Sequence, residues 1–503
     1  MRSKKAILNI LSNLVLQIVV ILYGFVLPKI IIENYGSNVN GLVSSITQFL
    51  AYIALLDSGF TVVIKSELYK PIADENTKKI DLILKSADKF FKRMAYIFIV
   101  YIIILAFLYP LLFEDSFGYW STFGLIIIIS ISNLAEYYFG MVYKIYLQAE
   151  QKGYIIAIIQ IIMYILTIII TLILSKLNIS IHILKLVTSV IFLIRPFLTA
   201  YYVKRQYNVN FKNVNNNYKI KNKWDGLAQH VASVIHGNTD ITVLTIFCTL
   251  AEVSVYSVYY MVIKGIKSLT LSFSNSLDAS WGNMIANKEY ENLNKKFNMY
   301  ETLYFSIITV IFTCTYFLIT PFVSIYTKGI TDVNYIRYLF GFLLVISEYI
   351  WAIRLPYSSV TLAAGDFKET RVGAWIECIS NIILSIILVI HYGLIGVTIG
   401  TIIAMLVRTV EFIYHTNKYI LKRSNIISIK KMLVLILETL LIINISNRLP
   451  LLDDINYLNW MINAFFVCLI SCFTVFIFDI LFYKKELSNF KKIAIGLLRR
   501  KNV

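Results

Sequence analysis

Uninterrupted runs of apolar residues dominate this sequence. Two of them, YIFIVYIIILAFLYPLLF at 96–113 and YIIAIIQIIMYILTIIITLIL at 154–174, contain no charged residue. Each approaches the ~20 residues with which an α-helix crosses a ~30 Å hydrocarbon layer. Because 58% of the 503 residues are hydrophobic and only 15% are charged, a water-soluble core cannot hide the apolar side chains. The fold class is therefore predicted to be an all-α polytopic membrane protein.

Fourteen transmembrane spans are predicted from these runs and the polar breaks between them. They cover residues 7–32, 40–64, 94–113, 119–143, 154–175, 180–203, 226–248, 252–278, 300–325, 334–360, 371–391, 394–417, 431–447 and 457–483. With the N-terminus inside, 36 of the 47 Lys and Arg residues fall in inner segments, five in outer segments and six within spans. This asymmetry follows the positive-inside rule and places both termini in the cytoplasm. The net charge of +18 then faces anionic lipid headgroups, and no nucleic-acid partner is expected.

Two segments, 178–205 and 391–418, resemble each other at a constant offset of 213 residues. In each, an arginine (Arg195 or Arg408) interrupts the apolar run. An offset of six spans preserves the orientation in the membrane, which indicates two parallel six-helix bundles; the alternative is chance similarity between isoleucine-rich helices. The predicted parts are an N-terminal six-helix lobe at 1–205, a cytoplasmic inter-lobe loop at 206–223, a C-terminal six-helix lobe at 224–420, two additional transmembrane helices at 421–483 and a basic cytoplasmic tail at 484–503.

The eighth predicted span carries two lysines one helical turn apart. Lys264 and Lys267 share an arc of about 80° with Tyr256 and Tyr260. A charged group at mid-bilayer costs ~2.5–3.5 kcal/mol, so it usually faces a partner or a water-filled cavity. The lysines therefore indicate a central cationic cavity that attracts an anionic substrate. The alternative is that each lysine pairs with a buried carboxylate elsewhere.

Four acidic or titratable residues within spans are candidates for ion or proton coupling. His236 and Asp240 lie at i, i+4 spacing on the seventh span, and histidine titrates near neutral pH. Asp57 lies on the second span and Glu348 near the centre of the tenth. An interhelical hydrogen bond remains the alternative for the His–Asp pair.

Further charges lie closer to the cytoplasmic ends of the spans. Lys65 lies near the cytoplasmic mouth of the second span, and Arg354 lies beside Pro356 on the tenth. Glu377 and Arg408 lie at matching depth on adjacent spans, which favours mutual neutralisation. Arg195 has no equally obvious partner on the fifth span.

Sequence motifs for catalysis or metal binding are absent. The chain contains neither a G-x-x-x-x-G-K-[ST] phosphate loop nor H-E-x-x-H, and its five cysteines lack zinc-ligand spacing. The inner and outer loops are too short for a folded catalytic module. We therefore expect a transporter without cofactor, metal or catalytic residues, energised by an ion gradient, the membrane potential or the substrate's own gradient.

The segment YGSNVNGLVSSITQFLAYIALLDSGF at 35–60, continued by VIKSELYKPIADEN at 63–76, carries a family resemblance. It resembles the second helix of bacterial polysaccharide flippases, the Wzx-type branch of the MOP exporter superfamily. The elements that carry the resemblance are Tyr35-Gly36, Asn40-Gly41-Leu42, Asp57-Ser58-Gly59 and Lys65 with Leu68-Tyr69-Lys70-Pro71. The layout of six, six and two helices is similar to that family along almost the entire chain.

The resemblance implies a V-shaped MOP/MATE-like transporter of two six-helix bundles plus two C-terminal helices. It implies a lipid-linked oligosaccharide on an undecaprenyl pyrophosphate carrier, turned over across the bacterial cytoplasmic membrane for capsule, O-antigen or related polysaccharide. Lys264 and Lys267 are then candidates for the pyrophosphate, and Tyr256 and Tyr260 for the sugars. Lys65 and Arg354 are candidates for capturing the headgroup at the cytoplasmic mouth. Partners would be membrane lipids and the polymerase and glycosyltransferases of the same pathway.

Two other functions remain open. A cation-coupled multidrug or metabolite exporter of the same fold would be expected to have acidic cavity walls, in contrast to the lysine pair. A membrane-embedded polysaccharide polymerase or ligase would need catalytic groups at the outer face, usually on a sizeable loop.

Overall fold

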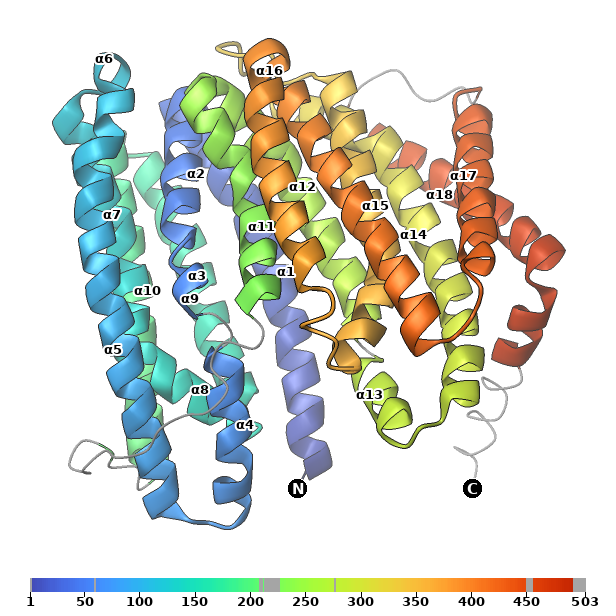
Figure 1. Cartoon of the computed structure of the whole chain (residues 1–503). Coiled ribbons are helices and arrows are strands. Elements are labelled where there is room, and N and C mark those ends of the chain that lie inside the picture. The colour runs from blue at the N-terminus through green and yellow to red at the C-terminus, as the bar shows by residue number, and fades with distance from the viewer. Residues whose placement is uncertain are drawn as a thin grey trace. The chain divides into compact units, whose positions relative to one another are not determined.

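The computed structural model describes residues 2–57, 60–207, 211, 227–275, 277–448 and 456–491, which form helices joined by short turns (Figure 1). In chain order the helices are α1 Arg2–Tyr35, α2 Ser37–Ala51, α3 Ala54–Asp57, α4 Phe60–Ala73, α5 Thr77–Leu108, η1 Tyr109–Leu112, α6 Glu114–Phe117, α7 Tyr119–Ala135, η2 Glu136–Gly140, α8 Met141–Ala149, α9 Gly153–Ser175, α10 Ile181–Gln206, α11 Leu227–Phe247, α12 Leu250–Asn275, α13 Asp278–Ala286, α14 Tyr290–Tyr326, α15 Tyr338–Ala363, α16 Arg371–His415, η4 Thr416–Ile420, α17 Asn425–Ser446 and α18 Tyr457–Phe482. Several begin at a side-chain cap: Asn76, Ser180 and Asn456 each accept a hydrogen bond from the backbone N–H three residues on.

Nine helices in the described part of the chain are long and apolar enough to cross a membrane. They cover Ile7–Tyr35, Thr77–Leu112, Tyr119–Ala149, Gly153–Ser175, Ile181–Gln206, Tyr290–Tyr326, Tyr338–Ala363, Arg371–Ile420 and Tyr457–Phe482. They account for ten of the fourteen predicted spans, because the Arg371–Ile420 helix contains two of them. The chain is thus an all-α polytopic membrane protein.

The predicted span 40–64 is not one continuous helix. Helix α2 ends at Ala51, a turn follows, and α3 and α4 continue the segment. The hydroxyl of Tyr52 in this turn lies 2.9 Å from the Thr242 hydroxyl on α11. The span at 40–64 stays a prediction, and the structure divides this segment at the turn after Ala51.

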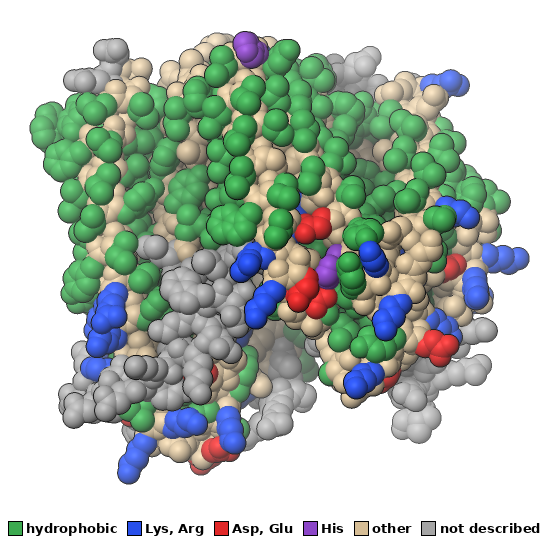
Figure 2. Space-filling model, viewed as in Figure 1, with side chains coloured by type: hydrophobic (Ala, Val, Ile, Leu, Met, Phe, Trp, Pro, Cys, Tyr) green, Lys and Arg blue, Asp and Glu red, His purple; other side chains and the backbone are tan. Residues whose placement is uncertain are grey.

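Large apolar side chains remain exposed along the helices. On α9, for example, Ile158, Ile162 and Ile169 are 46–48% exposed. Soluble monomers rarely expose contiguous patches of this kind, whereas acyl chains cover them in a membrane. Figure 2 shows hydrophobic side chains over the upper part of the helices, with most Lys and Arg side chains below them.

The chain divides into two compact units, Met1–Ser254 and Val255–Val503. The boundary lies inside α12. The predicted inter-lobe loop at 206–223 lies almost entirely outside the described residues.

In the first unit, α2 packs closely against the start of α12. The Asn40 side-chain amide donates a hydrogen bond to the Ser254 hydroxyl at 2.8 Å. A Cβ added at Gly41 would lie 1.8 Å from the carbonyl oxygen of Leu250, so only glycine allows this approach. Asn40 and Gly41 belong to the segment that carries the family resemblance, and here they act in helix packing.

In the second unit, α16 reverses direction at Gly393. This residue has φ 54° and ψ −128°, a conformation that favours glycine. The two halves pack so tightly that a Cβ on Gly396 would lie 2.1 Å from the carbonyl oxygen of Leu388. The halves occupy the predicted spans 371–391 and 394–417.

Candidate functional site

The candidate site of the second unit is built on α12. Tyr256 is buried, and its ring stacks on that of Tyr260 with centroids 5.6 Å apart and an interplanar angle of 25°. Lys264 and Lys267 follow along the same helix. The predicted helical spacing of these four residues is therefore present.

The two lysines differ in their surroundings. The Lys267 ammonium lies 2.8 Å from a Glu348 carboxylate oxygen and 4.5 Å from the centroid of the Trp351 ring. The side chains of Lys267 and Glu348 are 13% and 4% exposed. Lys267 thus pairs with a buried carboxylate, Glu348, which is the alternative that the sequence left open. Lys264 is exposed, and none of the described carboxylates forms an ion pair with it.

A second set of charges links α15 to both halves of α16. The Arg354 guanidinium lies 2.6 Å from Glu377, and Arg408 lies 3.3 Å from the other oxygen of the same carboxylate. The predicted Glu377–Arg408 pair is thus confirmed. Arg408 also contacts Glu411 and donates to the backbone oxygen of Thr370 at 2.9 Å. Two arginines and two glutamates cancel, so this set adds no net charge.

A pocket of about 380 Å³ opens between α12, α13 and α15 of the second unit. Its polar lining includes Ser274, Asp278 and Ser359, and the Ser359 hydroxyl donates a hydrogen bond to the Asp278 carboxylate. The volume is at the lower end of the range for small-molecule sites. Hydroxyl and carboxylate groups of this kind hydrogen-bond to polar ligands.

The remaining predicted site residues belong to the first unit, Met1–Ser254. Lys65 is half-buried on α4, and Asp240 is buried on α11. The side chains of Asp57 and His236 lie outside the described residues. The proposed His–Asp pair therefore stays a prediction.

Two buried carboxylates that pair with basic side chains were not identified from the sequence. The first is Glu136 at the π-helical turn η2, whose carboxylate lies 3.1 Å from Arg195 and 3.3 Å from Lys144. It supplies the partner that Arg195 lacked on the fifth span. No spacing rule relates Glu136 to Arg195, since the helices α7 and α10 meet only in the fold.

The second is Glu301 on α14, whose side chain is fully buried. Arg423 donates to both of its carboxylate oxygens at 2.9 and 3.0 Å, and the Lys431 ammonium lies 2.9 Å away. The Tyr357 hydroxyl also donates to it. From the sequence, Arg423 and Lys431 are predicted only to lie on the cytoplasmic side. Their contact with a buried Glu301 is not predicted.

No family model matches the chain, and no curated protein sequence matches it. Several solved structures share its fold, among them the following three. "Lipid II flippase MurJ, inward closed conformation" is 19% identical, with a TM-score of 0.70, and the match covers 96% of this chain and 100% of that chain. An inward-facing multidrug resistance MATE family transporter of the MOP superfamily is 14% identical, with a TM-score of 0.63, covering 79% and 94%.

The third is a MOP superfamily transporter from Pyrococcus furiosus, 12% identical, with a TM-score of 0.57, covering 84% of this chain and 97% of that chain. Its description reports a binding pocket of reversed polarity that suggests a different function. These similarities show that the chain has the fold of MOP-superfamily transporters. Each of these three proteins is described as a flippase or a transporter.

Proposed function

We propose that this MOP-fold transporter is a flippase for undecaprenyl-pyrophosphate-linked oligosaccharide units. It moves them across the bacterial cytoplasmic membrane for the assembly of capsule, O-antigen or a related surface polysaccharide. The observation that carries the proposal is Lys264, an exposed cation on α12 without a carboxylate partner among the described residues. A structure described as a lipid II flippase shares the fold.

Lys264 supplies the positive charge that an anionic headgroup needs. Lys267 adds to it by a change of partner: an incoming pyrophosphate competes with Glu348 for the ammonium, which sits 2.8 Å from that carboxylate. A buried carboxylate that loses its counter-charge is costly. The exchange therefore makes Glu348 a candidate for coupling substrate binding to an ion or a proton.

The other predicted site residues take supporting roles. Tyr260 presents a ring to the sugars and rests on the buried Tyr256. Lys65 assists headgroup capture at the cytoplasmic side, and Arg354 assists it by exchanging its partner Glu377, 2.6 Å away, for the headgroup. Asp57, His236 and Asp240 remain candidates for ion or proton coupling in the first unit.

The membrane topology is part of the proposal. We infer fourteen spans with both termini in the cytoplasm, arranged as two six-helix lobes at 1–205 and 224–420 and two further helices. The four spans beyond the ten matched by long apolar helices lie at α2–α4, α11, α12 and α17. Expected partners are the glycosyltransferases and polymerase of the same pathway.

Flipping of the lipid-linked oligosaccharide in proteoliposomes tests the proposal. An impermeant oxidant such as periodate measures the fraction of sugar exposed on the outer leaflet over time. Lys264→Ala should slow transfer roughly 10-fold or more, because a lost charge-assisted contact is worth ~1.5–3 kcal/mol. Lys264→Arg, which keeps the charge, should retain most of the rate.

Lys430→Ala is the matched control, since Lys430 is also exposed but lies at the start of α17. Its transfer rate should equal that of the unmodified chain. Equal rates for Lys264→Ala and Lys430→Ala would contradict the assignment of Lys264 to the substrate.

A cation-coupled multidrug exporter is the second candidate, because a multidrug resistance transporter shares the fold. Efflux of a cationic dye from cells that express the chain separates the two functions. If the chain exports the dye from cells but does not transfer lipid-linked oligosaccharide in proteoliposomes, the exporter is favoured.

A further inference from the structure

The two C-terminal helices each carry a buried carboxylate. Glu438 on α17 is 4% exposed and Asp479 on α18 is 6% exposed. The Ser306 hydroxyl on α14 lies 3.0 and 2.9 Å from the two oxygens of Asp479, and so donates to that carboxylate. None of the described residues donates a hydrogen bond to Glu438 or forms an ion pair with it.

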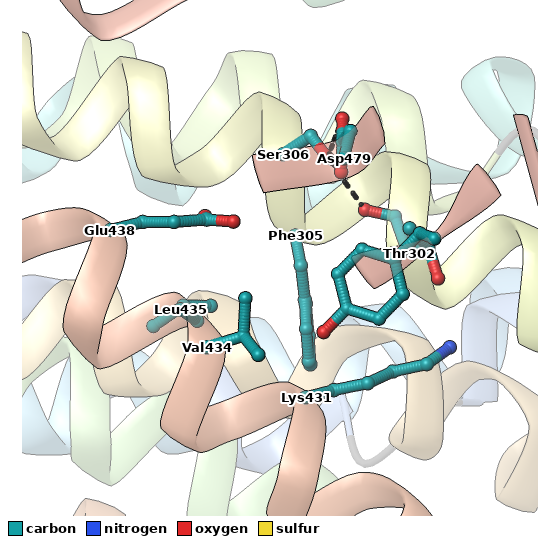
Figure 3. A pocket seen from close by; sticks show the side chains of 9 residues that line it. Thr302, Phe305, Ser306, Lys431, Val434, Leu435, Glu438 and Asp479 are labelled. Atoms are coloured by element: carbon teal, nitrogen blue, oxygen red, sulfur yellow. Dashed lines mark hydrogen bonds between the residues drawn. The ribbon is translucent and has the colours of Figure 1, made fainter. Parts of the chain in front are cut away.

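Both carboxylates line one small cavity. Its volume is about 10 Å³, close to the minimum for a single water molecule. Figure 3 shows Glu438 reaching from α17 toward α14, with Asp479 on the far side beside Ser306. Thus a nearly fully buried acidic side chain, without a hydrogen-bond or ion-pair partner among the described residues, lines this small cavity.

The neighbouring cations do not neutralise this pair. Lys431 lines the same cavity, but its ammonium lies 2.9 Å from Glu301 and donates to the backbone oxygen of Asn298 at 2.8 Å. Arg423 is likewise bound to Glu301. The three carboxylates Glu301, Glu438 and Asp479 therefore outnumber the two cations.

The other titratable groups near the pair are uncharged tyrosines or a further acid. They are Tyr349 on α15, Tyr483 just after α18, and Glu486. Among the described residues, α16 contributes no side chain to the cavity lining. The surroundings thus offer no additional positive charge.

We propose that Glu438 and Asp479 form a proton-binding site on the C-terminal helices, with the proton carried by Glu438. The Ser306 hydroxyl donates to Asp479, which favours the charged form of that carboxylate over that of Glu438. Glu438 faces no donor, so protonation is the means by which its buried charge is removed. Binding of one proton reduces the excess of negative charge in the cluster.

A proton fits this site better than a metal ion does. Calcium takes six to eight oxygen ligands, and magnesium keeps several waters in octahedral geometry. The cavity is lined by two carboxylates, by the hydroxyl residues Thr302, Ser306 and Tyr483 and by the cation Lys431, with room for about one water. The described residues also contain no cluster of three or more His, Cys, Asp or Glu side chains that could hold a metal.

Infrared difference spectroscopy on the purified full chain tests the site directly. The protonated carboxyl C=O stretch of Glu438 should be present at low pH and disappear as the pH is raised. Glu438→Gln should abolish this band, whereas Glu438→Asp should retain it. Glu369→Gln is the matched control, since Glu369 is exposed outside the helices, and it should leave the band unchanged.

The coupling between the two acids gives a second measurement. Asp479→Asn removes the neighbouring negative charge and should move the midpoint of the titration by ~1 pH unit or more. If Glu438→Gln does not elute as a monodisperse peak in size-exclusion chromatography, the titration midpoint measured in Asp479→Asn tests the proton site instead. A band that persists in folded Glu438→Gln, or a midpoint that is unchanged in Asp479→Asn, overturns the proposal.

Sodium is the remaining competitor, and replacing choline chloride by NaCl at constant pH tests it. Loss of the band in NaCl would mean that a cation displaces the proton, which overturns the assignment to a proton. The coupling of this proton to transport rests on the proposed function, but its binding does not. The infrared result can therefore succeed even if Lys264→Ala leaves oligosaccharide transfer unchanged.

Discussion

Removing the charge of Glu301 is expected to destabilise the second unit more than any exposed substitution. The side chain is fully buried, with Arg423 and Lys431 each at 2.9 Å. Glu301→Gln keeps the shape but leaves two cations, themselves 3% and 5% exposed, without their counter-charge. The unfolding free energy should fall for this reason.

The magnitude follows from the loss of a buried partner, which costs ~3–5 kcal/mol. At about 2–4 °C per kcal/mol for a unit of this size, Tm should fall by roughly 6 °C or more. Tryptophan fluorescence of the detergent-purified chain during heating measures this. The buried Trp281 and the intramembrane Trp351 both report on the second unit.

Two variants control for other causes. Lys431→Met leaves the Arg423–Glu301 contact in place and should lower Tm by less than Glu301→Gln does. Glu369→Gln changes an exposed glutamate and should leave Tm unchanged. If the Tm of Glu301→Gln equals that of Glu369→Gln, the ion-pair network around Glu301 contributes no stability and the reasoning is refuted.

Two further variants test contacts described above. Gly41→Leu should sharply reduce the yield of monodisperse protein in size-exclusion chromatography, because the new side chain meets the carbonyl of Leu250; Gly24→Leu, with no atom within 4 Å of its Cβ position, should be tolerated. Lys267→Met and Glu348→Gln should each lower Tm, whereas the double variant should lose less than their sum, with a coupling of ~0.5–3 kcal/mol. Additive losses would show that the ion pair does not form.

The sequence was sufficient for the class of fold because the bilayer imposes its requirement locally. A run such as 154–174 needs no tertiary information to be recognised as a span, and it forms α9. The segment at 40–64 needs that information. The turn after Ala51 is held by a contact between Tyr52 and Thr242, which no hydropathy pattern contains.

The candidate site divides in the same way. The depth of a residue in the membrane follows from its position along the span, so the pairing of Glu377 with Arg408 on adjacent spans was predictable. Which non-adjacent helices contact each other does not follow from the sequence, and the partner of Arg195, Glu136, was therefore not predicted. For the same reason the sequence could state both alternatives for Lys267 without choosing between them.

The hairpin of α16 has a mechanical consequence. Its two halves turn back at Gly393 without an intervening loop, and the ion pair between Glu377 and Arg408 fastens them far from the turn. Sliding one half of α16 past the other would break this ion pair and expose both charges to lipid. The two halves are therefore expected to move together as one rigid unit. Motion that opens or closes this unit has to be taken up where α16 meets its neighbours, and a crosslink between its halves should leave transport intact.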